Sequence, residues 1–201
     1  MAGETFDGLA RDRKGPADQY DVLILDGSHK HSLTSARSLA RAGLKVAIGE
    51  SIGQYPPRHE PPSFHSRYCA RALVLPDYVS EPTAYADAVL AFVREHGVKV
   101  VLPVGDANIT LLAPQRERFT EAGSFLAVAS EASLEIANDK TRTLEVASKL
   151  DIDYPKSVTV QAVEDLKTAE AQFGYPYVLK PTISWTGAVA NRMVPLEVMN
   201  E

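Results

Sequence analysis

The chain has 201 residues, and 45% of them are hydrophobic, which is enough for a packed core in one large or two small domains. Its formal charge of −5 comes without a basic run or arginine–aromatic interleaving, so nucleic acid is not an expected partner. A single cysteine, Cys69, excludes an intramolecular disulfide and a structural zinc site, and it fits a reducing cytoplasm. No stretch is long and apolar enough to span a bilayer, so no membrane is expected as a partner, and residues 1–20 are predicted to be a flexible leader.

Short continuous apolar runs predict the strands of a parallel sheet. The run at 22–25 is followed by a helical pattern that ends at Gly43, and Ser32 or Thr34 is the expected N-cap of that helix. A strand, a helix and a strand within about thirty residues form a βαβ unit, which requires parallel pairing. The pattern then continues with strands at 45–48, 72–75, 98–102 and 124–129 and helices at 85–96 and 109–112. The expected fold class is α/β, with an open parallel doubly wound sheet.

The character of the sequence changes near residue 130, where we expect a boundary between a domain at 21–129 and a second one at 130–201. Asn138 or Asp139 is available to cap the second of two helices beyond this boundary. The elements predicted there are helices at 130–137, 139–150 and 163–173 and strands at 156–160 and 177–180. Within the first domain, four prolines between 53 and 66 predict a loop, either a functional lid or a flexible connection.

Residues that follow the strands are the first candidates for a binding site, because ligands of open parallel sheets lie outside the carboxyl ends of the strands. The turn after the first strand has Gly27 alone where a dinucleotide fingerprint needs G-x-G-x-x-G, which argues against an oxidoreductase. His29 and His31 lack a third metal ligand nearby and are expected to be solvated. Asp106 is interpreted either as a helix cap or as a polar group that faces a ligand.

Lys180 ends an apolar strand and precedes Pro181, so its stem is expected to be buried and its ammonium to point to one end of the sheet. The following segment, 182–187, carries hydroxyls and backbone amides that could enclose phosphate oxygens. An ordinary turn between two strands is the other interpretation of this segment. The local pattern leaves both open.

The combination of Asn138-Asp139-Lys140, a helix, Tyr154-Pro155 and Tyr177-Val178-Leu179-Lys180-Pro181 resembles the opening of the ATP-grasp fold. The members that it resembles most are the carbamoyl-phosphate-synthase-like enzymes and the carboxylate–amine ligases. The resemblance covers 130–201, and 21–129 looks like the domain that precedes the grasp in those enzymes.

The resemblance implies ATP and Mg²⁺ as cofactors and small-molecule carboxylate and amine substrates. It assigns the phosphates of the nucleotide to Lys140 and Lys180 and to a closing loop that includes Ser184, Thr186 and Gly187, although bulky Ile183 and Trp185 depart from the usual glycine-rich form. The residues implied for the acceptor substrate are Ser28, Arg67 and Asp106, with Arg67 as a clamp for a carboxylate.

The acidic metal ligands of the resembled enzymes lie late in their fold and have no counterpart before Glu201. We therefore expect this chain to be an inactive N-terminal part of a ligase, without a metal site of its own. The competing hypothesis is a non-catalytic nucleotide- or metabolite-binding module. A homodimer is left open, because the sequence does not determine the oligomeric state.

Overall fold

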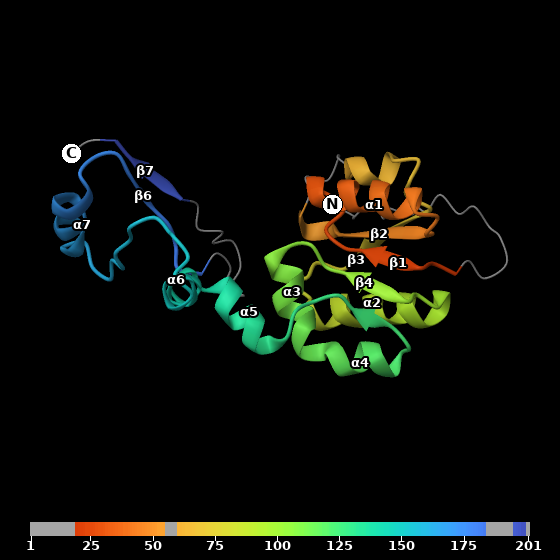
Figure 1. Ribbon diagram of the computed structural model, residues 1–201. Helices are drawn as coiled ribbons and strands as arrows, with labels where there is room; N and C mark the ends of the chain where they lie inside the picture. The colour runs from red at the N-terminus through yellow and green to blue at the C-terminus, as the bar shows by residue number, and fades with distance from the viewer. Residues whose placement is uncertain (1–18, 55–59, 184–194, 200–201) are drawn as a thin grey trace. The chain divides into compact units, whose positions relative to one another are not determined.

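A computed structural model describes residues 19–54, 60–183 and 195–199 of the chain (Figure 1). The chain divides into two compact units, unit 1 at Met1–Val128 and unit 2 at Ala129–Glu201. Each unit is described by itself below.

Unit 1 contains a five-stranded, all-parallel sheet in the order β3-β2-β1-β4-β5, as the sequence predicts. Leu23 and Leu25 face one side of this sheet, and Val22 and Ile24 face the other, because successive side chains of a strand alternate. Burial on both sides explains why β1 is continuously apolar. The strands are β1 (Val22–Ile24), β2 (Val46–Ser51), β3 (Arg71–Leu75), β4 (Val100–Leu102) and β5 (Phe125–Leu126).

Helices cover both faces of the sheet in unit 1 (Figure 1). On one face, α1 packs together with the short 3-10 helix η2, which stands where a crossover helix between β2 and β3 would be expected. On the other face, α2, α3 and α4 pack through buried side chains such as Tyr85, Leu112 and Phe119. The helices are α1 (Lys30–Arg41), η1 (Ile52–Gln54), η2 (Pro62–His65), α2 (Pro82–His96), α3 (Asp106–Leu112), η3 (Ala113–Gln115) and α4 (Arg116–Glu121).

The start of α1 differs from the prediction. His29 is the N-cap residue and makes no side-chain capping bond, so neither Ser32 nor Thr34 caps this helix. Ser32 lies inside the first turn instead, where its buried Oγ donates to the carbonyls of Leu25 (3.0 Å) and Asp26 (2.6 Å). The hydroxyl thereby ties the helix to the end of β1, which is a long-range role that a capping pattern does not reveal.

Unit 2 consists of α5 (Glu131–Asn138), α6 (Lys140–Lys149), α7 (Asp165–Phe173) and an antiparallel pair of strands, β6 (Tyr177–Leu179) and β7 (Leu196–Val198). Asp139 caps α6 by accepting from the backbone amides of Thr141 (2.8 Å) and Arg142 (3.2 Å), as predicted. The predicted strand at 156–160 is wrong. Its residues have no regular secondary structure, are almost all exposed, and pair with no strand in the described part of the unit.

Unit 2 buries little of its apolar surface. Ala169, at 2% exposure, is the only buried hydrophobic residue in its described part, whereas unit 1 has two buried clusters. Large apolar side chains remain in solvent, including Leu150 at 64% and Val163 at 77%. The described part of unit 2 thus lacks a hydrophobic core of its own.

Candidate functional site

The first candidate site lies at the carboxyl edge of the sheet in unit 1, between the loops that follow β1 and β4. After β1 the chain returns to β2 on one side, and after β4 it continues to β5 on the other, so these two loops flank the switch point of the sheet. Ligands of open parallel sheets bind in the crevice at this point. Ser28 and Asp106, both predicted as substrate-binding residues, belong to these two loops.

The carboxylate of Asp26 lies between these two loops. It accepts hydrogen bonds from the backbone amides of Val104 (3.1 Å) and Gly105 (2.6 Å) and from the side-chain amide of Asn108. Asp26 is only 5% exposed, and its φ of 58° turns the chain sharply after β1. A side chain at Gly105 would crowd this carboxylate, since an added Cβ would lie 3.1 Å from Asp26 Oδ1, so that Asp26 would have to shift by a few tenths of an ångström.

This arrangement disfavours a phosphate in the crevice. The amides of Val104 and Gly105 already have an anionic partner in Asp26, and a phosphate placed beside this carboxylate would meet a like charge. The structure therefore adds a second argument against a dinucleotide-binding oxidoreductase, besides the incomplete glycine fingerprint.

A second buried carboxylate, Glu50, lies at the end of β2. It is 6% exposed and accepts from the backbone amide of Ser28 (2.7 Å), from the Ser28 hydroxyl and from the amide of Ser51 (2.8 Å). Burial raises the pKa of Glu50, and the charge of Asp26 adds to this effect, while the three hydrogen bonds oppose it. Ser28 is thus held in place by Glu50, with its side chain half-buried.

Two buried polar side chains, Tyr85 and Asn108, lie close to these carboxylates. Both are at most 1% exposed, and Asn108 Oδ1 has no hydrogen-bond partner among the described residues. Burial raises the pKa of the Tyr85 hydroxyl, and the charges of Asp26 and Glu50 raise it further. Carboxylates and acceptor oxygens thus dominate this edge, which favours a ligand that donates hydrogen bonds or carries positive charge.

The structure brings the predicted substrate-binding residues together only in part. Asp106 is the first residue of α3, with an exposed side chain, and it lies on the same edge as Ser28. Arg67 lies at the other end of the sheet, because nearby Ala70 donates to Val46 at the start of β2 (2.9 Å). A strand of five residues separates the two edges by roughly 17 Å.

Sequence reasoning did not identify Asp26, Glu50 and Asn108 as site residues. Asp26 opens the segment 26–31, which follows a strand and is a predicted place for a site, but no role of its own was predicted for this carboxylate; Glu50 lies beyond a strand predicted to stop at Ile48. Asn108 was interpreted as a helix cap, but it lies inside α3, is buried and donates to Asp26. The signal that could have identified them is their place directly at the carboxyl ends of buried parallel strands.

The second candidate site is in unit 2 and contains the two predicted phosphate-binding lysines. Lys140 is the first residue of α6, and the amides of Thr141 and Arg142 in the same turn donate to the capping carboxylate of Asp139. Its backbone amide donates to the carbonyl of Thr182 (3.1 Å), and its Nζ lies 3.5 Å from the same oxygen. An antiparallel bridge between Asp139 and Ile183 extends this contact. Thr182 lies two residues after Lys180, so the segments that carry the two lysines meet.

Lys180 itself follows β6 with an exposed side chain, so the predicted burial of its stem is wrong. The reason is the thin packing of unit 2, in which β6 pairs with β7 and has no buried residue. Within the described part of the chain the Lys180 ammonium forms no ion pair. The other predicted phosphate-binding residues, Ser184, Thr186 and Gly187, lie outside the described residues.

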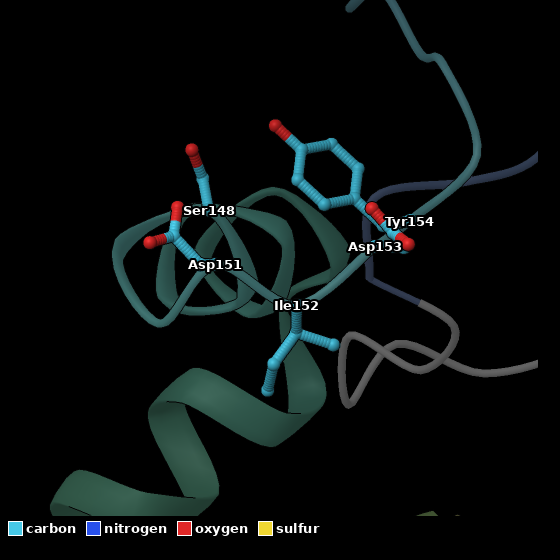
Figure 2. A pocket seen from close by; sticks show the side chains of 5 residues that line it. All are labelled: Ser148, Asp151, Ile152, Asp153 and Tyr154. Atoms are coloured by element: carbon cyan, nitrogen blue, oxygen red, sulfur yellow. The ribbon is translucent and has the colours of Figure 1, made fainter.

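A shallow depression of about 250 Å³ lies where α6 ends (Figure 2). Its lining comes from one continuous stretch and consists of Ser148, Asp151, Ile152, Asp153 and Tyr154, all of them exposed. Figure 2 shows Ile152 pointing away from Ser148 and Asp151, so the side chains do not converge on a common point. We assign no function to it.

Neither a metal cluster nor a membrane span is found in the described ranges. No three residues among His, Cys, Asp and Glu are grouped there so that they could hold a metal ion. No helix in those ranges combines the length and the apolar character that crossing a bilayer requires.

Comparison with solved structures places the fold. The chain is similar to the L-amino acid ligase from Bacillus licheniformis, with a TM-score of 0.58 and 18% identity over 91% of this chain and 40% of the ligase. It is similar to the biotin carboxylase of Campylobacter jejuni, with a TM-score of 0.53 and 15% identity over 90% of this chain and 39% of that one. The biotin carboxylase domain of a single-chain bacterial carboxylase gives a TM-score of 0.52 and 19% identity over 90% and 41%.

No protein-family model and no curated protein sequence matches the chain. The structural neighbours are ATP-grasp enzymes, and the chain spans about 40% of their length. The fold is therefore that of the N-terminal portion of ATP-grasp enzymes, and the predicted resemblance is confirmed for the fold.

Proposed function

We propose that this chain is the N-terminal part of an ATP-dependent ligase that activates a carboxylate as an acyl phosphate for attack by an amine or a similar nucleophile. In that reaction a carboxylate oxygen attacks the γ-phosphorus of ATP and ADP leaves. The nucleophile then attacks the acyl carbon, and phosphate and a proton are released. The fold of the neighbouring ligases and carboxylases supports this class of activity.

The observation that carries the proposal is the contact between the start of α6 and the segment after β6. It brings Lys140, at the N-terminus of α6, next to the residues that directly follow Lys180. Two ammonium groups on segments that meet suit the concentrated negative charge of a triphosphate. The residues of unit 2 therefore fit a nucleotide, with Lys140 and Lys180 as its proposed cationic ligands.

The candidate site of unit 1 carries carboxylates, whereas that of unit 2 carries two lysines. This difference suggests which substrate each unit binds. Asp26 and Glu50 make the carboxyl edge of unit 1 acidic and unfavourable for a phosphate. A donor such as the amine of the nucleophile suits that edge better. We therefore propose that Ser28 and Asp106 contact the amine-bearing substrate. Arg67 is not assigned to that site, because it lies at the other end of the sheet.

The described residues contain no group of three or more His, Cys, Asp or Glu side chains that could hold a metal ion. The alternative function is a module that binds a nucleotide or metabolite without catalysis. The two functions differ in turnover. A full-length protein that binds ATP but releases no ADP with any pair of carboxylate and amine would support the binding module.

The proposal is tested by calorimetric titration of the full-length protein with ATP and magnesium. Lys140→Gln and Lys180→Gln should each weaken binding by roughly tenfold or more, since a charge-assisted contact contributes about 1.5–3 kcal/mol. Lys149→Gln, in the last turn of the same helix α6, is the matched control and should change the affinity by less than about twofold. Equal effects of all three substitutions would refute a specific role for Lys140 and Lys180.

A further inference from the structure

Two arginines in unit 1 converge on a single tyrosine. The Arg67 guanidinium carbon lies 4.8 Å from the centre of the Tyr68 ring, and that of Arg41 lies 5.7 Å from it. Arg67 also donates from Nη2 to the Tyr68 hydroxyl at 2.7 Å. Arg41 is the last residue of α1, while Arg67 and Tyr68 belong to the segment between η2 and β3. Elements far apart in the sequence thus place two positive charges at one spot.

This cluster lies at the amino edge of the sheet. Ala70, two residues after Tyr68, donates to Val46, the first residue of β2. The helix α1 runs back over the sheet from the carboxyl edge, so its final residue, Arg41, reaches the amino edge as well. The cluster is therefore distinct from the carboxyl edge with its buried carboxylates.

No carboxylate in the described part of the chain neutralises the cluster. The helix α1 contains no acidic residue, and the ion pairs of unit 1 involve other cations: His65, His96, Lys99 and Arg118. The carbonyls at the end of α1 offset about half a charge, which leaves an excess of positive charge. The pKa of the Tyr68 hydroxyl is lowered, first by the hydrogen bond from Arg67 and then by Arg41. Two guanidinium charges held against one ring repel each other, and a bound anion would offset this repulsion.

We propose that Arg41, Arg67 and Tyr68 form a binding site for a small oxyanion, a phosphate or carboxylate group of a ligand, at the amino edge of the sheet in unit 1. Each guanidinium presents a planar fork of donors that matches the two oxygens of such a group, and both are exposed and accessible. The tyrosine fixes both forks through its ring and hydroxyl, which reduces the entropy lost when the anion binds. This site is independent of the proposed ligase reaction, and it suits an effector more than a reactant because it is remote from the carboxyl edge.

The test is a titration of the full chain with inorganic phosphate at low ionic strength, followed by NMR of the arginine side chains and by calorimetry. Acetate is titrated in parallel to represent a carboxylate, and chloride to represent screening alone. Saturable binding of phosphate or acetate, with a dissociation constant in the range of about 1 mM, is expected. Arg41→Gln and Arg67→Gln should each weaken it by roughly tenfold. Tyr68→Phe should weaken it less, since the ring remains.

Arg94→Gln is the matched control. Arg94 is an exposed arginine in the last turn of α2, as Arg41 is in α1, and its replacement changes the net charge equally. It should leave the affinity unchanged within about twofold. The proposal is overturned if Arg94→Gln weakens binding as much as Arg41→Gln, or if phosphate, acetate and chloride give the same unsaturated response. Because the three side chains are exposed or half-buried, the variants are expected to fold, and circular dichroism verifies this.

Discussion

Replacing Asp26 tests whether a carboxylate holds the switch point of the sheet together. Asp26→Ala removes the acceptor of three donors, the amides of Val104 and Gly105 and the side chain of Asn108. The two backbone amides are partly exposed and cost about 1 kcal/mol each, while the buried Asn108 costs about 2 kcal/mol. Alanine at a φ of 58° adds about 1 kcal/mol. The expected loss in the free energy of unfolding is therefore about 5 kcal/mol.

Asp26→Asn is the matched variant. Asparagine tolerates the left-handed conformation and keeps one oxygen for the amides of Val104 and Gly105. Its new amide group would face Asn108, whose Oδ1 is unpartnered, so rotation of the Asn108 amide by half a turn restores a hydrogen bond. The expected loss is only about 1 kcal/mol, mainly from the missing charge. Glycine adopts a positive φ without strain, so the free energy of unfolding of Asp26→Gly should be about 1 kcal/mol higher than that of Asp26→Ala.

The assay is urea unfolding followed by far-ultraviolet circular dichroism, together with hydrogen exchange of the Val104 and Gly105 amides. These two amides should exchange much faster in Asp26→Ala than in the wild type, and amides of α2 should follow the global loss of stability. The reasoning is refuted if Asp26→Ala costs less than about 1 kcal/mol, or if Asp26→Asn and Asp26→Ala cost the same.

Three further predictions concern single groups. The pKa of Glu50 is raised above its ordinary value of 4.5, so its contribution to stability is present below that pH and is lost as the pH rises through the folded-state pKa. In Glu50→Gln, the free energy of unfolding measured with urea should no longer decrease over this pH range. The assignment is contradicted if the decrease is the same in the variant and the wild type. Asp139→Ala should destabilise α6 by about 1 kcal/mol, seen as faster amide exchange of Thr141, whereas Asp139→Asn should retain the cap. Burial raises the pKa of Cys69 to about 11, so alkylation by iodoacetamide near pH 8 should be slow and should speed up on unfolding; fast alkylation of the folded chain would show that the thiol is accessible.

The sequence predicts the centre of the sheet of unit 1 well because β1 and β2 are buried along their whole length. Continuous apolar runs such as that of β1 arise where neither face of a strand meets solvent, and this occurs in parallel sheets covered by helices. The end of α2 is also predictable from the sequence, because Gly97 takes a φ of 59° that glycine tolerates best. Both signals are local, and they can be recognised without knowledge of the tertiary structure.

The sequence predicts where the candidate site of unit 1 lies, but not which residues contact one another in it. The edge follows from the parallel order of strands, and Ser28 and Asp106 were placed on it correctly. The pairing of Asp26 with Asn108 and of Glu50 with Ser28 joins residues 82 and 22 positions apart, and it depends on the register of neighbouring strands. Periodicity carries no information on that register. The predicted strand at 156–160 fails for the same reason, since high strand propensity yields a strand only where a partner is present.

The acidic edge of unit 1 also bears on where a nucleotide can bind. A triphosphate carries several negative charges, and each would interact unfavourably with the buried carboxylates of Asp26 and Glu50, which burial leaves poorly screened. The amides that usually bind phosphate at a switch point already serve Asp26. An α/β unit of this type can therefore keep the architecture of a nucleotide-binding fold while excluding the nucleotide itself. These electrostatics are the reason for our proposal that the amine-bearing substrate of a ligase would contact unit 1 and the triphosphate would contact Lys140 and Lys180 in unit 2.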